Sequence, residues 1–124
     1  MTEAHDWSTV RQALSPFGMM VRVENKLGKG TPDLAYCLRR VSGWLELKHD
    51  LSSLTLDQVM FAEGWAAAGG LAFMLWRRPG GWAIFNAAGM RALYSKTPAQ
   101  ESAILWESGP FPLKAVLTIL APRR

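Results

Sequence analysis

The sequence Gly30-Thr31-Pro32-Asp33 is followed thirteen residues later by Glu46-Leu47-Lys48, and these two stretches decide the fold. Asp33 opens an apolar run, and a second apolar run leads into Glu46 and Lys48. Between the two runs, Arg39 to Gly43 is polar and ends in glycine, which is typical of a hairpin loop. The sequence therefore predicts an antiparallel pair of strands over Leu34–Leu38 and Trp44–Lys48.

Strand alternation sorts the charged residues from the apolar ones in this hairpin. Successive strand side chains point to opposite faces, so Glu46 and Lys48 share one face while Leu45 and Leu47 share the other. Asp33 lies opposite the end of the second strand, within roughly 5–8 Å of its neighbours by direct or diagonal pairing. Two carboxylates and a lysine at that separation predict a divalent-metal site that can face a phosphate.

These residues resemble the motif of the PD-(D/E)xK nuclease superfamily. The closest likeness is to its compact virus-type (VRR-NUC) and Holliday-junction-resolvase-like members, which are often found in bacteriophages. The resemblance covers about residues 21 to 85. It implies a restriction-endonuclease-like α/β (α+β) core, in which helices flank a mixed central β-sheet. It also implies a metal-dependent nuclease with Asp33, Glu46 and Lys48 at the active site.

Phosphodiester hydrolysis needs an activated water and relief of the negative charge on phosphate. Mg²⁺ or Mn²⁺ held by Asp33 and Glu46 would supply both, and Mg²⁺ typically binds one or two carboxylates while keeping several waters. The family resemblance adds the backbone carbonyl of Leu47 as a further ligand. Lys48 would orient the water or offset charge that develops on phosphate.

Two further catalytic candidates follow from the resemblance. Resolvase-like relatives carry an additional upstream acid, for which we predict Glu24; Glu3 is the alternative, because other relatives place this acid on the first helix. Gln58 resembles a glutamine on the helix after the acid-x-Lys element. Helix capping explains Gln58 equally well, because Thr55 and Gln58 have the spacing of a capping box. His49 points to the opposite face on the alternating pattern.

The charge of the chain favours a nucleic-acid partner. The net charge is +4 and the sequence pI is about 9.6, with cations in local groups. Basic groups beside such a site suit a polyphosphate backbone, so we expect DNA, with branched DNA as the favoured form. One alternative is a non-catalytic DNA-binding or packaging accessory module, and another is the same chemistry on RNA or nicked DNA. The predicted phosphate contacts are Lys26, Lys29, Arg39 and Arg40.

Length and composition indicate one soluble domain over residues 1–124. The start of the chain lacks the pattern of a signal peptide, and no apolar run approaches a membrane span. The single cysteine, Cys37, falls in mid-strand, where we expect a small buried side chain; a lone cysteine also fits a reducing compartment. These features predict a cytoplasmic protein.

The last predicted helix, Leu113–Leu120, is apolar on nearly every side. It either completes the core or packs against a second subunit, and a homodimer would suit a two-fold DNA junction. Apolar spacing and capping signals give the remaining elements. These are helices over Asp6–Leu14, from Thr55 to Gly69-Gly70, over Ala87–Tyr94 and from Thr97 toward Trp106, and strands over Met19–Val23, Leu71–Arg77 and Trp82–Phe85.

Overall fold

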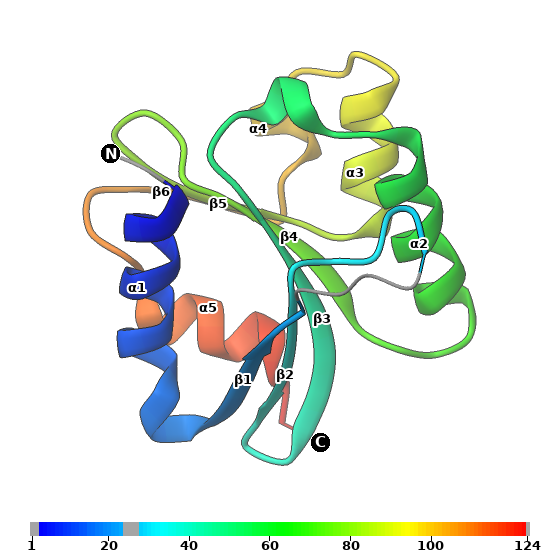
Figure 1. Cartoon of the computed structure of the whole chain (residues 1–124). Coiled ribbons are helices and arrows are strands. Elements are labelled where there is room, and N and C mark those ends of the chain that lie inside the picture. Colours follow the sequence, from blue (N-terminus) through cyan, green and yellow to red (C-terminus); the bar gives the residue numbers. More distant parts are fainter. Residues whose placement is uncertain (1–2, 24–27, 124) are drawn as a thin grey trace.

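The computed structural model describes residues 3–23 and 28–123 (Figure 1). Short 3-10 turns, η1 (Ser15–Phe17) and η2 (Leu51–Ser53), accompany the regular elements. The helices are α1 (Glu3–Leu14), α2 (Leu56–Ala67), α3 (Ala87–Tyr94), α4 (Ala99–Ser102) and α5 (Leu113–Leu120). The strands are β1 (Gly18–Arg22), β2 (Leu34–Leu38), β3 (Val41–Lys48), β4 (Ala72–Trp76), β5 (Gly81–Phe85) and β6 (Leu105–Ser108).

The six strands form one mixed sheet in which each strand lies beside its neighbour in sequence, from β1 to β6. Only the β3–β4 pair is parallel, and the other four pairs are antiparallel. A parallel pair needs a crossover connection, and α2 provides it. The predicted α+β architecture with a mixed sheet and helical cover is therefore confirmed.

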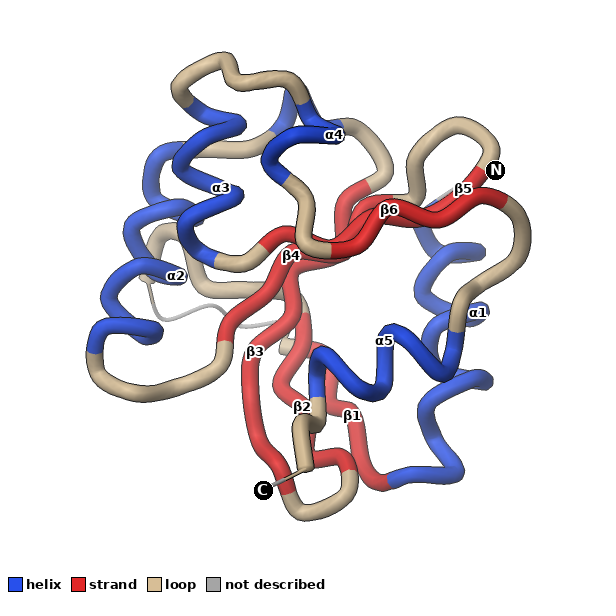
Figure 2. The backbone as a smooth tube through the Cα atoms, turned by 180° about the vertical axis from the view of Figure 1, so that it is seen from behind, coloured by secondary structure: helices blue, strands red, loops and turns tan. Residues whose placement is uncertain are grey.

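Helices cover both faces of the sheet. Figures 1 and 2 show α1 and α5 on one side and α2 and α3 on the other. Leu45 and Leu47 face α1 and α5 and belong to the larger buried cluster. Val116, Leu117 and Leu120 of α5 lie in the same cluster, so the last helix completes the core of its own chain.

The turn between β2 and β3 is tighter than predicted. Strand β3 begins at Val41, and Leu38 pairs with Val41, which leaves Arg39 and Arg40 as the two turn residues. Their φ angles are 50° and 68°, and two positive φ angles in a two-residue loop define a type I′ hairpin turn. The predicted loop from Arg39 to Gly43 was wrong because type I′ turns usually show Asn-Gly or Asp-Gly in the sequence.

The helix predicted from Thr97 toward Trp106 was also wrong. Helix α4 ends at Ser102, and the chain continues as strand β6, in which Trp106 pairs with Ala83 of β5. Ile104 N–H already donates to the Ile84 carbonyl at 2.8 Å. Pairing with the outer edge of β5 therefore overrides the local helix signal.

Cys37 is exposed, contrary to the prediction of a buried side chain. Its cross-strand neighbour in β1 is Met19, which is 67% exposed, and Val21 of the same strand is 48% exposed. All three side chains lie on the face of the sheet opposite α1 and α5. The helices on that face therefore leave part of β1 and β2 open.

In the described parts of the chain, no helix is both long and apolar enough to cross a membrane. The longest helices have 12 residues, whereas a span needs about 20.

Tyr36→Phe tests the hydrogen bond that joins the end of α5 to the sheet. Tyr36 is buried in β2, and its hydroxyl donates to the carbonyl of Leu120 at 2.7 Å. Burial raises the pKa of Tyr36, so the phenol stays a neutral donor. We expect Tyr36→Phe to lower the free energy of unfolding by about 1–2 kcal/mol in urea titrations, because a buried carbonyl loses its donor. Tyr94→Phe, at an exposed tyrosine, is the control, and an equal effect of both changes would contradict this role.

Candidate functional site

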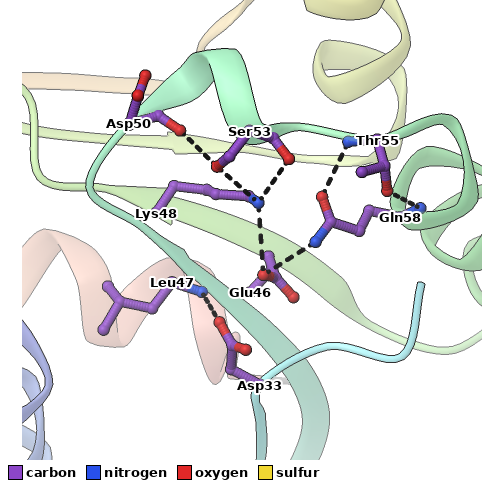
Figure 3. Close-up of polar contacts among 8 residues, drawn as sticks. All are labelled: Asp33, Glu46, Leu47, Lys48, Asp50, Ser53, Thr55 and Gln58. Atoms are coloured by element: carbon purple, nitrogen blue, oxygen red, sulfur yellow. Dashed lines mark hydrogen bonds and ion pairs between the residues drawn. The ribbon is translucent and has the colours of Figure 1, made fainter. Parts of the chain in front are cut away.

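The β2–β3 hairpin brings the predicted acids together at its open end (Figure 3). Leu34 pairs with Leu45, so Asp33, one residue before this pair, lies opposite Glu46, one residue after it. The Leu47 N–H donates to Asp33 Oδ2 at 3.1 Å and anchors this carboxylate to β3. Backbone pairing therefore sets the relative position of the two acids.

Glu46 and Lys48 lie side by side on the α2 face of β3, as strand alternation predicts. Their side chains are only 6% and 8% exposed, and Lys48 Nζ lies 3.8 Å from Glu46 Oε2. Burying two charges costs several kcal/mol per ion unless each is paired and hydrogen-bonded. Each of these side chains has such additional partners.

The segment after β3 folds back to receive the Lys48 ammonium group. Lys48 Nζ donates to the Ser53 carbonyl at 3.1 Å and lies 3.0 Å from the Ser53 hydroxyl. Ser53 Oγ donates in turn to the Asp50 carbonyl at 2.7 Å. Asp50 begins the η2 turn and accepts hydrogen bonds from the Ser52 hydroxyl and N–H, which lower the pKa of Asp50. The η2 turn therefore fixes the lysine.

Gln58 caps α2 and also contacts Glu46. Its side-chain carbonyl accepts from Thr55 N–H at 3.0 Å, while Gln58 N–H donates to Thr55 Oγ1 at 3.2 Å, completing a capping box at the start of α2. The amide Nε2 donates to Glu46 Oε2 at 3.3 Å. One amide thus links the first turn of α2 to Glu46.

Gly30 lets the segment before Asp33 approach α2 closely. Its φ is 80°, and a Cβ at this position would meet the backbone of Asp57 and Gln58. Only glycine fits both the left-handed conformation and this close contact. Lys29, the residue before Gly30, is exposed.

An aromatic cluster holds α2 against β3 on the same face. Trp44 packs edge-on against Phe61 and Trp65, with ring centroids 5.6 Å and 5.7 Å apart. Phe61 and Trp65 stack on each other at 5.6 Å. This packing fixes the distance between Gln58 and Glu46.

The donor set matches a hard divalent cation. Asp33 and Glu46 offer carboxylate oxygens, and Mg²⁺ is commonly bound through one or two carboxylates with waters filling the remaining positions. Within residues 3–23 and 28–123 no group of three or more His, Cys, Asp and Glu side chains could hold a metal. Carboxylate oxygens are the ligand type that Mg²⁺ and Mn²⁺ prefer, whereas structural Zn²⁺ sites favour nitrogen and sulfur ligands.

Four further predicted site residues remain, and the structure describes two of them. Glu24 and Lys26 fall outside the described residues. Arg39 and Arg40 form the turn at the opposite end of the hairpin from Glu46.

His49 lies on the opposite face from Lys48, as predicted, and meets a buried acid that sequence analysis missed. Its Nδ1 is 2.8 Å from Asp6 Oδ2, and Asp6 is 1% exposed. Arg77 Nε lies 3.8 Å from the other carboxylate oxygen of Asp6. Asp6 is four residues before Val10 and lies on the same buried face of α1. An acid at this position of an apolar helix face is the sequence feature that could have indicated a buried carboxylate.

Comparison with known proteins gives a likeness in fold. No protein-family model matches the chain, and no curated protein matches its sequence. Among solved structures, it is similar to Hjc, a Holliday junction resolvase from the hyperthermophilic archaeon Archaeoglobus fulgidus, with a TM-score of 0.53 and 19% sequence identity. The match covers 70% of this chain and 74% of that one. The likeness shows a shared restriction-endonuclease-like fold, with a mixed sheet flanked by helices.

Gln58→Ala and Thr55→Ala form a matched pair that tests the link to Glu46. Each removes one half of the capping box, so each is expected to lower the free energy of unfolding by about 1 kcal/mol. The same two changes are then made in a Glu46→Gln background. The effects of Thr55→Ala and Glu46→Gln on the free energy of unfolding should add within about 0.5 kcal/mol, whereas those of Gln58→Ala and Glu46→Gln should depart from additivity by more than that. Urea unfolding of the single and double variants measures both, and additivity for Gln58 would contradict its contact with Glu46.

Proposed function

We propose that this chain is a divalent-metal-dependent endonuclease that hydrolyses DNA phosphodiester bonds and favours branched or junction DNA. The observation that carries the proposal is the convergence of Asp33, Glu46, Lys48 and Gln58 at the open end of one hairpin. The resolvase-like fold supports it, because the similar structure is that of a Holliday junction resolvase. The narrower virus-type (VRR-NUC) and phage assignments stay predictions from the motif.

Each residue of the cluster has a defined task in this proposal. Asp33 and Glu46 would hold Mg²⁺ or Mn²⁺, with the Leu47 carbonyl as a further ligand; the bound ion supplies an activated water and Lewis-acid polarisation of phosphate. Lys48, fixed by Ser53, presents its ammonium group to the negative charge that develops on the phosphoryl oxygens.

Gln58 acts as a positioning residue. Its hydrogen bond to Glu46 Oε2 restrains the carboxylate while the capping box restrains Gln58 itself. A ligand held by such outer contacts is pre-organised for its metal. Gln58 therefore contributes without contacting substrate.

The additional upstream acid in this proposal is Glu24, and Glu3, at the start of α1, is the alternative. Replacing each by glutamine in the cleavage assay below decides which of them is needed.

A homodimer is part of the proposal, since a two-fold junction suits a two-fold enzyme. The buried side of α5 is used inside the chain, so a second copy would need another surface. Exposed apolar side chains offer one on α2 and β1, at Leu56, Met60, Trp65, Met19 and Val21. Sedimentation velocity measures the oligomeric state directly.

The proposal is tested by cleavage of a labelled four-way junction beside its linear arms, with Mg²⁺, Mn²⁺ or EDTA. We expect metal-dependent cutting that favours the junction. Asp33→Asn and Glu46→Gln should abolish it, because each removes a ligand charge, and Lys48→Ala should slow it by about 10²–10³-fold. Circular dichroism checks the fold, and Glu101→Gln, at an exposed acid on α4, is the control.

Four outcomes would change the conclusion. Equal cutting of all DNA forms would keep the nuclease and remove the junction preference. Cutting of RNA alone would change the substrate class. Tight DNA binding without cutting under any metal would favour the accessory DNA-binding module, and normal turnover in Glu46→Gln would contradict the assigned site.

A further inference from the structure

An open cavity of about 620 Å³ lies at the turn end of the β2–β3 hairpin, away from the carboxylates. Figure 1 shows the chain after α5 running beside this turn. Among residues 3–23 and 28–123, three arginines and three small apolar residues line the cavity, and no acidic residue does. The lining is Arg39, Arg40, Val41, Ala121, Pro122 and Arg123.

The two turn arginines adopt a backbone conformation that arginine disfavours. Arg39 and Arg40 have φ angles of 50° and 68°, in the left-handed region where a Cβ crowds the following carbonyl. Type I′ turns favour Asn-Gly for this reason. Residues held in such strained conformations are concentrated at binding and catalytic sites.

The local packing explains the position of Arg39 but not the choice of arginine at both positions. Arg39 N–H donates to the Phe17 carbonyl at 2.9 Å, a backbone contact that any residue except proline could make. Its guanidinium lies 5.4 Å from the Phe17 ring, which aligns the side chain at the cavity. Arg40 is exposed.

We propose that this cavity binds the phosphate backbone of DNA, at a second contact remote from the phosphate that is cut. The inference rests on the proposed nuclease function and adds a substrate-binding subsite to it. Guanidinium groups bind phosphate oxygens through paired hydrogen bonds, so three of them without an acid suit a backbone of phosphates.

The length of β3 sets the reach of this contact. Glu46 is five residues after Val41, which at about 3.3 Å per residue is roughly 17 Å along β3. The segment after α5 covers the face of the sheet opposite Glu46, so this length is the minimum separation of the two places. One DNA strand carries a phosphate about every 3.4 Å along the duplex axis, so 17 Å corresponds to about five base pairs. Only substrates with arms longer than about five base pairs can reach both places.

The double change Arg39→Asn with Arg40→Gly separates structure from binding, because it installs the residues that the turn prefers. We expect a Tm no lower than that of the wild type. Binding of a fluorescent four-way junction with long arms is measured in EDTA at several salt concentrations. The slope of log K against log salt concentration should become shallower by about two, since each lost phosphate contact removes about 0.9 from it. Between 50 and 200 mM salt, the ratio of variant to wild-type affinity should then change about tenfold.

Two companion variants control for charge. Arg39→Lys with Arg40→Lys keeps both charges and should retain the wild-type salt dependence of DNA affinity. Lys96→Asn with Lys114→Gln removes two exposed charges that do not line the cavity, and should leave the slope within half a unit of the wild type. The affinity difference for the Asn-Gly variant should also vanish when the arms are shortened below about five base pairs.

The possible failures are distinguishable. Wild-type slope and affinity in the Asn-Gly variant would overturn the phosphate subsite while leaving the nuclease intact. If the same variant instead lost binding of polyglutamate, the cavity would be reassigned to an acidic protein. Absence of DNA binding by the wild type at every salt concentration would overturn the proposed function itself.

Discussion

The site depends on the burial of two opposite charges, Glu46 and Lys48, on one strand, because each must be paired and hydrogen-bonded there. Removing a carboxylate and an ammonium group from water costs several kcal/mol each, and their attraction at 3.8 Å offsets this only with further hydrogen bonds. Ser53 and Gln58 supply those bonds. The turn and the helix start that follow β3 are therefore built around one ion pair.

The β2–β3 hairpin contributes to both the hydrophobic core and the candidate site because its two faces bear different residues. Leu45 and Leu47 fill the cluster under α1 and α5, while Glu46 and Lys48 face α2. A slip of one residue would exchange the faces, so the buried leucines fix the register that aligns the acids. The two ends of the hairpin also differ, with carboxylates at one end and a turn of strained arginines at the other. In the proposed function, this one rigid element would position a phosphate for cleavage and hold a more distant part of the same backbone.

The sequence predicted those parts that depend on local periodicity. Strand alternation placed Glu46 and Lys48 on one face, and the Thr55–Gln58 spacing predicted where α2 begins. Features set by tertiary contacts were not predictable in this way. Strand β6 forms because β5 offers a free edge, and Ser53 reaches Lys48 only after the η2 turn folds back. The buried Asp6 was missed because its partners, His49 and Arg77, come from other elements of the chain.

Binding of Mn²⁺ measured by titration calorimetry tests the central claim, that Asp33 and Glu46 together hold a divalent cation, without requiring a DNA substrate. The wild type is predicted to bind one ion per chain at this site. Asp33→Asn and Glu46→Gln should each weaken binding at least tenfold, while Glu101→Gln should not change it. Equal affinity in the wild type and Glu46→Gln would contradict the account, because the buried carboxylate would then serve its contacts within the protein and not a metal ion.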